Sequence, residues 1–255
     1  MDVQTAVLLF GVAFLAGAIN SVAGGGTLIS FPGLLAIGLG PKVANVTNTV
    51  AVVPGFLGGS IAYRDEVKRQ PENVKLVVPP ALLGSLTGSI ILLSTPESTF
   101  EAVVPFLIYG ACFVLAFQDR IGAFYRRGVT RDDAHVETWR LRFAIYFVTI
   151  YGGYFGAAMG IIVLAALGVF LPDDIQRSNA LKGIVALVTN ALAAAYFAVF
   201  ANVAWDAAGV MAFATLVGGF AGARVAMRLS KDRLRFGIIS YGVVAATVLL
   251  VRLFI

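Results

Sequence analysis

Residues that carry acid–base, redox or metal chemistry are scarce in this chain. Its 255 residues include a single cysteine, Cys112, and a single histidine, His135. One cysteine excludes an internal disulfide, and these two residues lie too far apart to suggest a metal-ligand motif. Its apolar segments also lack a pair of aspartates, and the sequence has no serine motif with an accompanying base. It therefore argues against an enzyme and predicts neither a cofactor nor a bound metal.

Charged residues are also few. They make up 13% of the chain, whereas 59% is hydrophobic, and the mean hydropathy is +0.88. Soluble domains are nearer one quarter charged, and a bilayer is crossed by runs of about 18–20 apolar residues. Several runs here reach that length, and alternating barrel strands are absent. We therefore expect an all-α polytopic membrane protein in contact with the lipid bilayer. Its net charge of +5 is attributed to basic cytoplasmic loops rather than to a nucleic-acid partner.

The apolar segments fall into two groups on either side of one long polar stretch. That stretch, residues 119–140, is expected to be a cytoplasmic linker between a first membrane repeat, 1–118, and a second, 141–255. The expected helical segments are 5–23, 27–40, 42–63, 74–94 and 99–118, followed by 141–157, 160–171, 180–201, 207–227 and 236–255.

The two groups resemble each other in sequence. A shift of 134 residues pairs Gly26 with Gly160, Asn45 with Asn179, Asn48 with Lys182, Gly84 with Gly218, and Gly88 with Gly222. Matches in the same order along both halves indicate internal duplication.

The loops of the two halves carry opposite charge patterns. Residues 64–75 are rich in lysine and arginine, whereas their counterpart, 201–206, has neither. The next loop reverses this, because the basic residues lie at 228–235 and not near 94–99. Positive charge marks the cytoplasmic side, so the sequence predicts two repeats of inverted topology.

Inversion requires an odd number of crossings in each repeat. Three full crossings per repeat then leave residues 5–40 and 141–171 as broken, re-entrant helical hairpins. Their return limbs, 27–40 and 160–171, would span only about 21 Å and 18 Å as helices, against a hydrocarbon core of about 30 Å. The triplet Gly24, Gly25 and Gly26 lies at the turn of the first hairpin.

One charged residue is expected inside a segment. Lys182 lies near the start of 180–201, and every acidic residue lies in a loop, a tail or a segment boundary. A lysine at bilayer depth costs about 2.5–3.5 kcal/mol, which favours a functional role. The alternative is that Lys182 lies shallow enough to reach the cytoplasmic surface.

Polar residues and glycines accompany this lysine. Asn45 and Asn48 share a helix face, as do Asn179 and Lys182. The hairpin turns at Gly24–Gly26 and near Gly160 would direct backbone N–H groups inward, which favours an anion. The candidate substrate-binding residues are Gly24, Gly25, Gly26, Asn45, Asn48, Gly160, Asn179 and Lys182. The alternative is that these polar groups cap helices or join them by hydrogen bonds.

Two motifs carry a family resemblance. The run AINSVAGGGTLISFPGLLAIG with Thr47-Asn48, and the run YGGYFGAAMG followed by SNALK, resemble the sulfite exporter TauE/SafE family. The resemblance implies export of a small sulfur-containing anion, such as sulfite or sulfoacetate, across the bacterial inner membrane. We therefore expect a secondary transporter that works by alternating access. An anion channel or a component of a membrane complex is the alternative, and a homodimer is left open.

Overall fold

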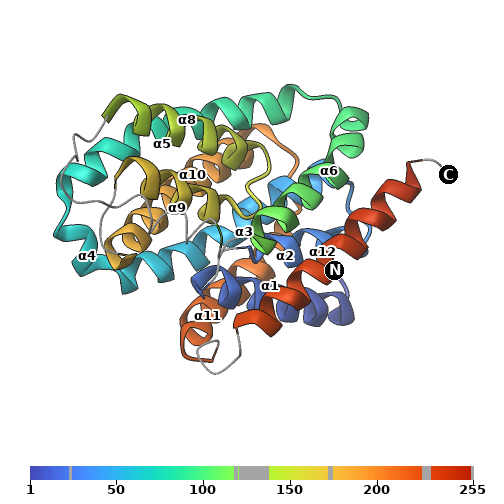
Figure 1. Cartoon of the computed structure of the whole chain (residues 1–255). Helices are drawn as coiled ribbons and strands as arrows, with labels where there is room; N and C mark the ends of the chain where they lie inside the picture. Colours follow the sequence, from blue (N-terminus) through green and yellow to red (C-terminus); the bar gives the residue numbers. More distant parts are fainter. Residues whose placement is uncertain (23–24, 118–119, 121–137, 172–174, 226–230, 254–255) are drawn as a thin grey trace.

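The computed structural model describes residues 1–22, 25–117, 120, 138–171, 175–225 and 231–253 (Figure 1). The regular elements within these ranges are α-helices. In chain order they are α1 (Val3–Val22), α2 (Thr27–Ala36), α3 (Pro41–Ala62), α4 (Arg64–Lys68), α5 (Pro71–Ser94), α6 (Glu97–Ala116), α8 (Thr138–Tyr154), α9 (Met159–Phe170), α10 (Ile175–Phe200), α11 (Trp205–Val225) and α12 (Lys231–Arg252).

Each expected segment corresponds to a helix, and the short α4 within a basic loop is additional. α8 begins at Thr138, so the last residues of the expected linker are already helical. Most of that linker, including His135, lies outside the described residues. The largest errors in helix starts are at α10, which begins at Ile175 rather than 180, and at α12, which begins at Lys231 rather than 236, because the first turns of both helices are polar.

Several helices are suited to cross a membrane. Among the described residues, five are long and apolar enough, in α1, α5, α6, α10 and α12. α3 is as long as these, but its Asn45, Thr47, Asn48 and Thr49 lower its hydropathy. α2 and α9 are shorter, with 10 and 12 residues, or about 15 Å and 18 Å of helix. The predicted short return limbs are therefore present.

In each hairpin, one sharp turn connects the two helices. In the first, Gly25 has φ 128°, and in the second, Gly156 has φ 75° and Ala158 has φ 58°. Positive φ is accessible to glycine at little cost, whereas alanine is strained there. The turns meet through the ring of Phe31 on α2, which packs edge-on against Phe155 at 5.3 Å between centroids.

Helices from opposite halves of the chain pack together. α1 lies against α11, α5 lies against α8, and α3 lies against α10. In Figure 1, α5 and α8 occupy one end of the molecule, α1, α11 and α12 the other, and α3, α9 and α10 lie between them. Hydrogen bonds between the two halves stabilise this packing. Thr215 Oγ1 on α11 donates to Ala51 O on α3 at 2.7 Å, and Ser85 Oγ on α5 donates to Thr189 O on α10 at 2.6 Å.

Glycines make these close contacts possible. A Cβ at Gly84 or Gly88 on α5 would overlap the backbone carbonyls of Tyr146 or Ile150 on α8. A Cβ at Gly218 on α11 would overlap the carbonyl of Phe14 on α1 in the same way. The glycines at four-residue spacing therefore mark helix–helix contacts, since small residues let two backbones approach closely.

We expect Gly88→Ala to lower the thermal unfolding temperature of the detergent-solubilised protein, because the added methyl group forces α5 away from α8. Overpacking of this kind costs about 1–3 kcal/mol. Gly110→Ala on α6 is the matched control, because a Cβ there meets nothing within 4 Å. Equal unfolding temperatures for the two variants would contradict this account of the α5–α8 contact.

Candidate functional site

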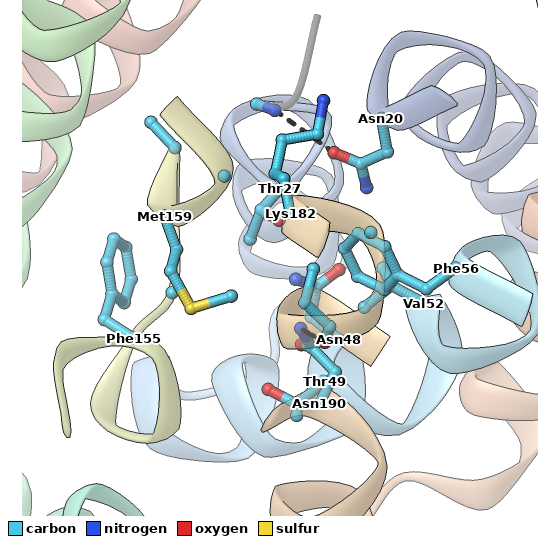
Figure 2. A pocket seen from close by; sticks show the side chains of 16 residues that line it. Asn20, Thr27, Asn48, Thr49, Val52, Phe56, Phe155, Met159, Lys182 and Asn190 are labelled. Atoms are coloured by element: carbon cyan, nitrogen blue, oxygen red, sulfur yellow. Dashed lines mark hydrogen bonds between the residues drawn. The ribbon is translucent and has the colours of Figure 1, made fainter. Parts of the chain in front are cut away.

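A small cavity with a mixed polar and apolar lining lies between α3 and α10, next to the turns of both hairpins (Figure 2). The space open to water-sized molecules is about 50 Å³. The lining residues are Asn20, Gly25, Thr27, Asn48, Thr49, Val52, Phe56, Phe155, Gly156, Ala158, Met159, Gly160, Lys182, Gly183, Ala186 and Asn190. These residues come from both halves of the chain, so the cavity forms only when the halves pack together.

The two central helices contribute matching faces to the cavity. α3 provides Asn48, Thr49, Val52 and Phe56, and α10 provides Lys182, Gly183, Ala186 and Asn190. Within each set the spacing is that of one side of a helix. The same 134-residue shift that relates the two halves pairs these residues one to one. The cavity is thus built from equivalent positions that differ in chemistry.

Lys182 supplies the positive charge. Its Nζ donates to Asn179 Oδ1, one turn earlier on α10, at 3.2 Å. Its methylene groups lie over Gly160, where an added Cβ would sit 3.5 Å from Cδ of the lysine. The lining residues include no aspartate or glutamate. Within the described ranges no ion pair neutralises this ammonium group, so the cavity has an excess of one positive charge.

Two carboxamides face the cavity from opposite helices. Asn48 is 1% exposed, and its Oδ1 has no hydrogen-bond partner among the described residues. Asn190 donates from Nδ2 to Ala186 O at 2.8 Å, which leaves its oxygen beside the cavity. A buried polar group without a partner costs about 1–3 kcal/mol. A polar solute or water in the cavity would remove that cost.

The glycine turn has a different role from the one its sequence suggests. Asn20 Oδ1 accepts hydrogen bonds from Gly25 N at 3.1 Å and Gly26 N at 2.8 Å. The expectation that these two N–H groups are free to bind a ligand is therefore wrong. Glycine is needed for shape instead, because Gly25 has a positive φ and a Cβ on Gly26 would overlap the carbonyl of Ala16. Gly24 lies outside the described residues.

The predicted site residues are only partly brought together. Gly25, Asn48, Gly160 and Lys182 line the cavity, whereas Gly26, Asn45 and Asn179 do not. Asn45 Nδ2 instead donates to Tyr154 O at 2.9 Å. This satisfies a carbonyl at the end of α8, as in the capping alternative. Asn179 touches the site only through its bond to Lys182.

Sequence reasoning missed Asn20, Thr49 and Asn190 as lining residues. Asn190 lies two turns after Lys182 on the same face of α10, and this spacing could have indicated it. The comparison of repeats hides it, because its partner position is the aromatic Phe56. Asn20 could have been found from its place just before the glycine triplet, where a carboxamide can bind turn N–H groups.

The model of the sulfite exporter TauE/SafE family matches residues 9–249. The chain belongs to this family. Similar proteins include a "Probable membrane transporter protein" from Haemophilus influenzae, 25% identical over 92% of this chain and 90% of its own length. "Probable membrane transporter protein YfcA" from Escherichia coli strain K12 is 27% identical over 87% of this chain and 79% of its own.

A third relative, "Probable membrane transporter protein ORF9" from a Sinorhizobium species, is 27% identical over 86% of this chain and 82% of its own. This member of the TauE/SafE family is thus a multi-pass bacterial membrane protein and a membrane transporter, not an enzyme. The cavity between α3 and α10 is its candidate substrate site.

We expect Asn20→Ala to destabilise the protein, because the N–H groups of Gly25 and Gly26 would lose their common acceptor. Two lost bonds at about 0.5–1.5 kcal/mol each set the scale. Asn190→Ala is the matched control, since it also truncates a lining carboxamide but removes only a bond within its own helix. Thermal unfolding in detergent should rank Asn20→Ala well below Asn190→Ala. The reverse order would refute the capping role of Asn20.

Proposed function

We propose that this protein is a secondary transporter that exports a small anion, sulfite or an organosulfonate, across the inner membrane by alternating access. The observation that carries the proposal is the ammonium group of Lys182 in a cavity whose lining has no acid. A fixed positive charge attracts an anion, and the carboxamide NH2 groups of Asn20, Asn48 and Asn190 are donors of the kind that an anion accepts from.

The size of the cavity supports a small solute. One water molecule needs about 10–15 Å³ of the space measured in this way, and the cavity has about 50 Å³. That space suits a solute of a few non-hydrogen atoms, which is the size of sulfite or the simplest sulfonates. A nucleotide or a sugar phosphate would not fit without a rearrangement of α3 and α10.

The proposal includes two repeats, 1–118 and 141–255, inserted with opposite orientation. The packing of α1 on α11 and of α5 on α8 supports this arrangement. The 134-residue shift relates α1 to α8 and α5 to α11, so the two contacts are equivalent. The one-to-one match between the cavity residues of α3 and α10 also supports it. Loop charge agrees, because the basic residues follow α3 in one half and α11 in the other.

The position of the cavity between the two halves supports alternating access. Its walls come from both halves, so rocking the α1–α11 pair against the α5–α8 pair would open it to one side of the membrane and then to the other. The α1–α11 and α5–α8 pairs would have to move as units, because glycines hold their backbones in close contact. A channel would not need this alternation, because its pore opens to both sides of the membrane at once.

We expect Lys182→Met to abolish anion counterflow in proteoliposomes, because the cavity loses its full positive charge while the apolar stem is retained. The measurement is the uptake of labelled sulfite into vesicles preloaded with sulfite, sulfate or methanesulfonate. Lys75→Met is the control, since Lys75 pairs with Glu72 on the exposed surface of α5 at 2.9 Å. Wild-type counterflow in Lys182→Met would remove Lys182 from the mechanism. Conductance without saturable counterflow in the wild type would indicate a channel.

We expect Lys68→Cys and Arg235→Cys to be labelled from the same side of the membrane, because inverted repeats place both basic loops in one compartment. Val3→Cys should be labelled from the other side. Each cysteine is introduced after Cys112→Ala, and an impermeant maleimide is applied to intact cells and to inverted vesicles. If Lys68→Cys and Arg235→Cys react from opposite sides, the two repeats are not inverted.

A further inference from the structure

We propose that the cavity accepts singly charged oxyanions and discriminates against doubly charged ones of the same size. This inference rests on the proposed transport function and narrows its substrate class. Sulfite would then be carried in its singly protonated form, hydrogen sulfite, which brings its own proton. Among organosulfonates, those without a second acidic group would be favoured, and sulfoacetate, which carries a carboxylate beside its sulfonate, would be a poor substrate.

The charge balance of the lining is the first argument. Lys182 is the one lysine, and no arginine or histidine accompanies it among the lining residues. Removing an anion from water is costly unless a fixed charge compensates it. One ammonium group compensates a singly charged anion, but it leaves the second charge of sulfate buried without a counterpart. Arg177, earlier on α10, does not line the cavity.

The distribution of polar and apolar groups is the second argument. Asn20 and Lys182 both line the cavity with polar groups, and Phe155 and Met159 contribute apolar side chains to its lining (Figure 2). Val52 and Phe56 add apolar surface from α3. A solute with charged oxygens at one end and an apolar group at the other matches this arrangement. A sulfate ion would place a charged oxygen against the apolar side.

The paired registers of α3 and α10 provide the third argument. The position equivalent to Lys182 is Asn48, which is buried and whose oxygen has no partner among the described residues. A second cation at that position would face the same cavity. The chain has a neutral carboxamide at this position and a cation only at Lys182. A bound anion therefore meets one positive charge rather than two.

The test compares exchange of labelled methanesulfonate and labelled sulfate in proteoliposomes that contain the full chain. These anions have the same number of non-hydrogen atoms in the same tetrahedral arrangement and differ in charge. We expect methanesulfonate to exchange at least about tenfold faster than sulfate, a ratio that corresponds to about 1.4 kcal/mol. Equal rates would overturn the inference and leave the transport function standing. Failure to exchange sulfite and both probes would contradict the transport function itself.

Two variants separate charge from shape. We expect Asn48→Lys to raise sulfate exchange relative to methanesulfonate, whereas Asn48→Gln, which lengthens the side chain without adding a charge, should not raise this ratio. We expect Asn190→Asp, which changes charge with almost no change in shape, to lower methanesulfonate exchange at least tenfold by cancelling the charge of Lys182. Size-exclusion profiles and thermal unfolding verify that each variant is folded.

If Asn48→Lys does not fold, Asn190→Asp alone still tests the inference. Wild-type methanesulfonate exchange in folded Asn190→Asp would overturn the inference. An unchanged preference in folded Asn48→Lys would overturn it as well, since the charge of the lining would not then set the selectivity.

Discussion

The excess of one positive charge in the cavity is the constraint on which the site depends. Lys182 sits two turns inside α10, and among the residues that the structure describes no carboxylate lines the cavity to neutralise it. A membrane protein bears the cost of a buried ammonium group only where the group has work to do or can reach water. Here its stem lies over Gly160, and among the described residues its Nζ donates only to the oxygen of Asn179. The remaining donors of the ammonium group are available to an anion.

The cavity exists because two equivalent helix faces meet. α3 and α10 each present the same register of residues, and the hairpin turns close around them. The outer helices hold this arrangement, because α1 with α11 and α5 with α8 approach closely at Gly218, Gly84 and Gly88. An added methyl group at one of these glycines would overlap the backbone of the neighbouring helix.

The glycine triplet shows how a motif can be located correctly and interpreted wrongly. It does lie at the turn between α1 and α2, and Gly25 does line the cavity. The N–H groups of Gly25 and Gly26 are nevertheless taken up by the side chain of Asn20. A sequence shows which residues can turn sharply, but the partners of their backbone groups depend on side chains that the turn itself brings close.

The sequence alone determined the helical membrane class, the order of the helices, the likeness of the two halves and the unusual position of Lys182. These follow from hydropathy and from spacing along the chain, which are local properties. Only the tertiary structure decided that Asn45 caps α8, that Asn190 and Phe56 line the same cavity, and that α1 packs on α11. Those contacts join residues more than a hundred positions apart, and no local pattern specifies which distant surface a helix face will meet.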